Sequence, residues 1–118
     1  IFLFTGIWRI LLTPVSQIKK FLTMPEMTFR VRWPDGKEAE CYSPSLVIQD
    51  YFTQNQDYTL PDFLQKVHGA LTEASERVRA RYGFPCSRAL GQLHSIKQAC
   101  AQFANIQDAQ VRVLTFTL

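Results

Sequence analysis

Residues 74–90 read ASERVRARYGFPCSRAL, and this stretch ends one predicted helix and begins a second. Gly83 suits the left-handed position that closes a helix, and the proline two residues later prevents the helix from continuing. Cys86, Ser87 and Arg88 then stand at the start of the second helix, with Ser87 as its predicted cap. The stretch therefore predicts two consecutive helices joined by a tight turn.

Apolar residues recur at helical spacing on both sides of this turn. The first helix is expected to begin after Thr59, because Pro61 and Asp62 follow it in a capping arrangement. Its apolar stripe is Phe63, Leu64, Val67, Leu71, Ala74, Val78 and Tyr82. The second helix is expected over residues 87–104, with Leu90, Leu93, Ile96, Cys100 and Phe103 as its stripe.

A second informative stretch, TFRVRWPDGKEAEC, covers residues 28–41. Its first six residues alternate polar with apolar, which predicts a strand, and Pro-Asp-Gly fits a three-residue hairpin loop. That loop pairs Trp33 with Lys37 and so fixes the register. The charged face then pairs Arg32 with Glu38 and Arg30 with Glu40. Cys41 falls on the apolar face, where a buried thiol is expected.

The last element, residues 111–118, is rich in β-branched and aromatic residues and predicts a strand that is apolar on much of both faces. Such a strand belongs inside the sheet, paired with the first hairpin strand. Residues 49–52 predict a short turn, and the polar residues 53–58 predict a loop. The expected fold is α+β: a three-stranded sheet, made of an N-terminal β-hairpin and a C-terminal strand, with two principal helices packed on one face.

Composition limits the classes of function. The 118 residues carry a net charge of +3, but residues 1–23 contain three basic residues and no acid, while the rest holds ten of each sign. A neutral domain argues against nucleic-acid binding. The three cysteines show no zinc-ligand spacing, and their odd number fits a reducing cytoplasm. Neither a metal nor another cofactor is expected.

The N-terminal segment begins IFLFTGIWRILL, which is too short to span a bilayer and lacks the order of a signal peptide. One interpretation is an interfacial anchor, with Trp8, Arg9, Lys19 and Lys20 on its polar side. The favoured interpretation is that residues 1–23 are an extension outside the native domain. A single domain is then expected over residues 24–118.

Cys86 is the one place where catalysis is considered. A helix N-terminus and a neighbouring arginine both lower the pKa of a thiol. A catalytic thiol also needs a base, and His94 lies roughly 12 Å along the same helix at 1.5 Å per residue. His68 reaches Cys86 only if tertiary packing brings it there. A capping or buried role is therefore favoured over a reactive one.

A binding surface is the other candidate. Arg77 and Arg81 are four residues apart on one helical face, and Arg88 begins the next helix. Such a group suits a carboxylate, a phosphate or an acidic partner surface. The alternative is a solvated face in which arginines pair with Glu73 and Glu76. The candidate binding residues are Arg77, Arg81, Tyr82, Cys86, Ser87 and Arg88.

Four blocks of the chain resemble the bacterial nitrogen-starvation response family over residues 24–118: MTFRVRWPDG (27–36), CYSPS (41–45), ASERVRARYGFPCSRAL (74–90) and VRVLTF (111–116). The resemblance implies gene clusters that also encode a nitrilase and a radical-SAM protein, and a link to nitrogen limitation and to nitrile nitrogen. It implies no assigned reaction and no catalytic residues.

Residues and resemblance together predict a non-enzymatic accessory or binding protein of a nitrogen-starvation or nitrile-nitrogen assimilation pathway. Its expected partner is an enzyme of the same gene cluster or a small anionic metabolite. A small thiol-dependent enzyme or carrier that uses Cys86 is the alternative.

Overall fold

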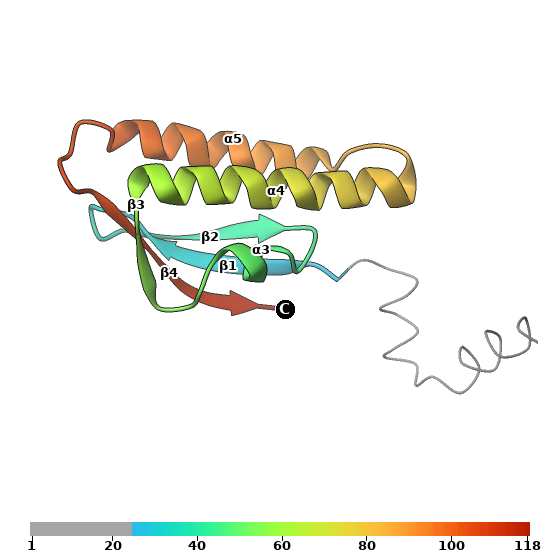
Figure 1. The fold of residues 1–118 in the computed structure, drawn as a ribbon, viewed down its shortest axis with the longest axis horizontal. Helices are drawn as coiled ribbons and strands as arrows, with labels where there is room; N and C mark the ends of the chain where they lie inside the picture. The colour runs from blue at the N-terminus through green and yellow to red at the C-terminus, as the bar shows by residue number, and fades with distance from the viewer. Residues whose placement is uncertain (1–24) are drawn as a thin grey trace, which may run out of the picture.

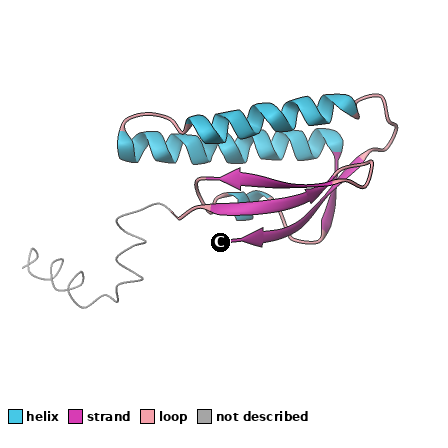
Figure 2. Cartoon of the chain, turned by 180° about the vertical axis from the view of Figure 1, so that it is seen from behind, coloured by secondary structure: helices cyan, strands magenta, loops and turns pink. Residues whose placement is uncertain are grey.

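The computed structural model describes residues 25–118, which fold into an antiparallel sheet with helices on one face (Figure 1). These residues form four strands, β1 (Met27–Arg32), β2 (Glu38–Ser43), β3 (Gln56–Thr59) and β4 (Gln110–Thr117), in the spatial order β2-β1-β4-β3. Helices α4 (Leu60–Tyr82) and α5 (Ser87–Gln102) form the second layer, and the short helix α3 (Ile48–Tyr51) packs beside α4. Figure 2 shows the two layers from behind. The α+β class and the placement of both main helices on one face are confirmed.

The hairpin has the predicted register. The amide of Trp33 donates to the carbonyl of Lys37 at 2.8 Å, and Gly36 has a φ of 86°, as a three-residue loop requires. The ion pairs differ from the prediction, because both arginines bind one carboxylate. Arg30 Nε lies 2.9 Å from one oxygen of Glu38, and Arg32 lies 3.1 Å from the other.

Arg30 and Glu40 lie opposite each other as predicted, but the ion pair expected between their side chains is not formed. Glu40 instead accepts a hydrogen bond from Thr28 Oγ1 at 3.2 Å. Long side chains reach diagonal neighbours across a sheet. The Glu38 carboxylate has two oxygens, so it can accept a hydrogen bond from each arginine. The hydrogen bonds from Arg30 and Arg32 hold the pKa of Glu38 below its usual range.

A fourth strand corrects the expected count of three. Residues 53–58 were predicted as a loop, but β3 pairs with β4 along its whole length. Asn55, with a φ of 59°, precedes the strand, and its amide donates to the carbonyl of Val113 at 2.7 Å. Only Tyr58 of the strand's four residues is buried. A strand this short with one inward side chain produces no alternation that the sequence could display.

The C-terminal strand lies inside the sheet and pairs with β1, as predicted. The expectation that it is buried on both faces is wrong. Val111 and Val113 are fully buried under the helices, whereas alternate positions of the strand are partly or fully exposed. A central strand needs neighbours on both edges for its backbone hydrogen bonds, but that does not require both faces to be covered.

The helices begin and end largely where the sequence predicts. Thr59 caps α4 by accepting a hydrogen bond from the Asp62 amide at 3.4 Å. Gly83, with a φ of 88°, ends α4 and donates to the Arg79 carbonyl at 2.8 Å. The apolar stripes are shorter than predicted. Their buried members are Phe63, Val67, Leu71 and Ala74 from the first stripe, and Leu93, Ile96, Cys100 and Phe103 from the second.

Tyr82 and Leu90, assigned to these stripes by spacing, are 48% and 43% exposed. For Tyr82, Figure 1 shows the reason: the end of α4 and the turn after it reach beyond the sheet. Side chains there have no sheet beneath them. Helical periodicity continues to the end of α4, but the surface that would bury its last apolar residues does not.

The expectations for residues 1–23, an extension or an interfacial anchor, lie outside the described residues. In the part of the chain that is described, no helix is both long enough and apolar enough to cross a membrane.

Candidate functional site

The turn between α4 and α5 is held by a hydrogen bond from one helix to the other. The hydroxyl of Ser75, which is buried on α4, accepts from the amide of Cys86 at 3.2 Å. Cys86 occupies the cap position of α5, and its carbonyl accepts from the Leu90 amide. Ser87, predicted as the cap, is instead the first residue of the helix and is exposed. The chain direction after Pro85 places the cap one residue earlier than the sequence preference suggested.

Arg88 lies against the sheet at this end of the molecule. Its guanidinium carbon is 3.8 Å from the centre of the Tyr42 ring on β2, a close cation–π contact. The edge of β2 is tied to α5 at the same place, because the Tyr42 amide donates to the Gln92 side chain at 3.0 Å. Within residues 25–118, Arg88 forms no ion pair shorter than 4 Å. Its charge is therefore held over the Tyr42 ring without a direct ion pair to a carboxylate of the described residues.

The surroundings of Tyr42 favour its neutral form. Burial is the larger cause and the nearby Glu26 carboxylate adds to it, and together they raise the pKa of Tyr42 to about 12. A small cavity of about 140 Å³ opens here, lined by Glu26, Tyr42 and Arg88 with the ends of β1 and β4. Neither Tyr42 nor Glu26 was among the sequence candidates. Only the pairing of β2 with α5 brings them beside Arg88.

The remaining arginines of the predicted surface have different partners. Arg77 contacts Glu73 at 3.3 Å and the Ser45 hydroxyl at 3.3 Å, so it ties α4 to the segment after β2. Arg79 pairs with Glu76 at 3.7 Å. Arg81 lies 5.9 Å from the centre of the Tyr82 ring. The pairing of arginines with Glu73 and Glu76 is the alternative that was predicted for this face.

Exposed apolar side chains gather where the helix pair reaches beyond the sheet. We call residues 79–90 the junction surface. Phe84 is 65% exposed, and Tyr82 and Leu90 are about half exposed. A hollow of about 460 Å³ lies among Arg79, Phe84 and Leu90, with Ser75 and Pro85 also lining it. Phe84 was not among the binding residues predicted from the sequence.

The three thiols lie in different surroundings. Cys41 and Cys100 are buried, as predicted, and Cys86 is partly exposed. Burial, with a smaller effect of the Glu40 charge, raises the pKa of Cys41 to about 12, and burial raises that of Cys100 to about 11. Both therefore remain protonated at neutral pH. Cys86 is the one thiol of the three that is not buried.

Potential partners of Cys86 are distant from it or unbonded to it. His94 lies on the same helix, two turns on, and His68 is exposed on α4. Between residues 25 and 118, no hydrogen bond joins the Cys86 thiol to either histidine. No group of three or more His, Cys, Asp or Glu side chains in that range is arranged to hold a metal ion.

The described residues define a small α+β protein: an antiparallel sheet under two helices, with its exposed apolar and cationic groups at the helix turn. A family model described as nitrogen starvation-induced protein NitG matches residues 28–116, so the chain belongs to that family. Neither the search of curated proteins nor the search of solved structures gave a match.

Proposed function

We propose that this chain is a non-enzymatic accessory protein of the nitrogen-starvation response, and that it binds a partner protein through the junction surface. Membership of the nitrogen starvation-induced family supports the setting. The observation that carries the binding role is the exposure of Phe84, Tyr82 and Leu90 at the helix turn, with Arg88 held over Tyr42 in the first turn of α5. Exposed apolar groups rimmed by polar ones mark interaction sites in soluble proteins.

The composition of the surface fits a protein partner better than a small anion. Tyrosine and arginine are the residue types that contribute most to binding energy at protein interfaces. Arg88 is already ordered on Tyr42, so less side-chain entropy is lost when a partner carboxylate binds it. We therefore expect a partner with an apolar patch for Phe84 and an acidic residue near Arg88. The other form of this binding role is that a small anionic metabolite binds in the cavity beside Arg88 and Tyr42.

The first partner to test is an enzyme of the nitrile-nitrogen gene cluster that the family resemblance implies. Tagged protein would be used to capture partners from nitrogen-starved cells, with nitrogen-replete cells as the reference. Phe84→Ala and Arg88→Ala should each reduce recovery of the partner at least tenfold. Lys37→Ala in the hairpin loop, far from the junction surface, is the matched control and should leave recovery unchanged. Equal recovery by all four proteins would refute the assignment of this surface.

A thiol-dependent enzyme or carrier is the second candidate, and the partial exposure of Cys86 favours it. In that case iodoacetamide should label Cys86 in the folded protein well before Cys41 and Cys100. If the thiol is required, Cys86→Ser should abolish function under nitrogen starvation. If the chain has only an accessory role, Cys86→Ala and Cys86→Ser should both keep that function. Retained function in both variants would exclude the thiol role.

A further inference from the structure

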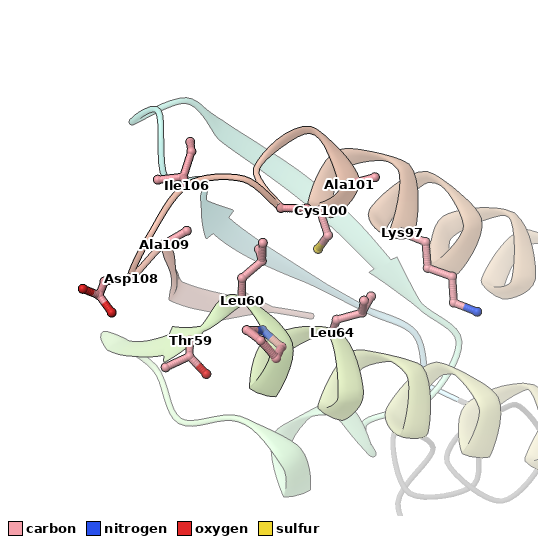
Figure 3. Close-up of a pocket in the computed structure, with 11 residues that line it drawn as sticks. Thr59, Leu60, Leu64, Lys97, Cys100, Ala101, Ile106, Asp108 and Ala109 are labelled. Carbon is pink, nitrogen blue, oxygen red and sulfur yellow. The ribbon is translucent and has the colours of Figure 1, made fainter.

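A second hollow lies at the opposite end of the helix pair from the junction surface. Its volume is about 680 Å³, and it is formed by the beginning of α4, the end of α5 and the loop that leads into β4 (Figure 3). Leu60 and Leu64 form one wall, and Ala101 and Ala104 form the other. This apolar groove plays no part in the function proposed above.

Small side chains explain why the groove is open. Ala101 on α5 and Ala104 just after its end line the groove together with the leucines of α4, and their methyl groups do not fill the space between the two helices. Phe103, the next large residue, is turned inward and stacks on Trp33 at 6.1 Å between ring centres. The backbone at the base is satisfied, because the Leu60 amide donates to the Ala109 carbonyl at 3.0 Å. The groove is thus an apolar surface, and none of the described residues leaves a buried side-chain polar atom there without a hydrogen bond.

Its charged rim is asymmetric. Lys97 lies at one end of the groove, and within residues 25–118 its ammonium forms no ion pair shorter than 4 Å. Asp108 lies at the other end, and Figure 3 shows its carboxylate directed away from the groove. The Cys100 thiol points into the groove and forms an uncharged part of its lining. An occupant with an apolar body and one negative group at the Lys97 end would satisfy both features.

We propose that this groove binds a soluble medium-chain carboxylate, with its chain along Leu60, Leu64 and Ala101 and its carboxylate at Lys97. The volume lies within the range of small-molecule sites, which are mainly apolar with few polar groups that fix orientation. The ammonium selects an anion over a neutral or cationic compound with the same chain. The apolar walls select for chain length.

Titration of the full chain with octanoate, followed by amide NMR shifts, tests the site. Shifts should be confined to residues 59–64 and 97–109. Affinity should rise about fourfold per methylene from hexanoate to octanoate, as expected for burial of CH₂ groups. Octanol should bind more weakly than octanoate, and octylamine more weakly still.

Two variants separate the walls from the charge. Ala104→Phe fills the groove and should weaken octanoate binding at least tenfold. Lys97→Gln should abolish the preference of octanoate over octanol while octanol still binds, and Lys37→Gln is the matched lysine control. Lys97 is on the surface, so its variant remains decisive if the bulkier one fails to fold.

Three results would overturn the proposal. They are shifts outside the two ranges, an octanoate preference that persists in Lys97→Gln, and shifts of the same amides on concentrating the protein without ligand. The last result would make the groove an interface between copies of the chain.

Discussion

Replacement of Ser75 by alanine tests the bond that sets the position of the whole junction. The Ser75 hydroxyl accepts the Cys86 amide at 3.2 Å, and Ser75 is 3% exposed. Leaving a buried donor unsatisfied costs about 1–3 kcal/mol. Because Cys86 is itself partly exposed, water can reach its amide, so we expect a loss near the lower end, about 1 kcal/mol. Ser87→Ala is the matched control, and as an exposed position it should cost less than about 0.5 kcal/mol.

Urea unfolding would measure both variants. With a denaturant dependence of about 2 kcal/mol per molar urea, Ser75→Ala should lower the midpoint by about 0.5 M. Hydrogen exchange should also quicken in the first turn of α5, because the segment that Ser75 holds begins there. If Ser87→Ala costs about 1 kcal/mol and Ser75→Ala costs nothing measurable, then Ser87 is the true cap and the junction geometry described above is wrong.

Three further predictions concern stability. A Cβ on Gly69 would lie 3.1 Å from the Tyr51 ring. Gly69→Ala should therefore raise the free energy of unfolding by less than the ~1 kcal/mol expected from improved helix propensity. Thermal melts should show the full gain only in a Tyr51→Ala background. The pKa of Cys41 is raised by burial from 9.0 to about 12, so folding stability is fully present below pH 9 and falls above it. The part of the loss that is due to Cys41 should be about 1.4 kcal/mol by pH 10, and a Cys41→Val variant that loses as much stability as the unchanged chain between pH 8 and pH 10 would contradict the assignment. The pKa of Glu38 is lowered, so its contribution is present above the unfolded value of 4.5 and is lost as the pH falls through the folded value. Glu38→Gln should therefore flatten the acid side of the stability profile by a small, salt-sensitive amount, and an unchanged profile would show that its two arginine partners contribute nothing.

The hairpin and the helix ends could be predicted because local rules determine them. Pro-Asp-Gly fixed the loop length, the loop length fixed the register, and the register placed Cys41 on the buried face, as observed. Thr59 and Gly83 likewise act within one turn of their own helix. In such places the residues that determine the local structure are close neighbours in the sequence.

The errors have a different origin, because they depend on contacts between segments distant in sequence. Strand β3 is held by pairing with β4, more than fifty residues later, and little in QDYT indicates that pairing. The exposure of Tyr82 depends on how far α4 extends past the sheet, which the helical spacing of apolar residues does not indicate. Arg88 was a candidate from the sequence, but its contact with Tyr42 requires α5 to cover the edge of β2.

The candidate site was therefore predicted in part. The stretch 74–90 contains the residues that form the junction surface, and the structure separates Arg77 from it by giving that residue Glu73 and Ser45 as partners. The apolar groove has no sequence signal, because alanines in a helix predict only a helix. Open space is a property of packing between elements.

Site-specific crosslinking tests the central claim most directly. A photoreactive phenylalanine analogue would replace Phe84 in one protein and Ile106, which is comparably exposed at the far end of the helix pair, in another. In nitrogen-starved cells, the account predicts a discrete protein adduct at position 84, reduced by Arg88→Ala, and no such adduct at position 106. An adduct at position 106 with none at position 84 would contradict it.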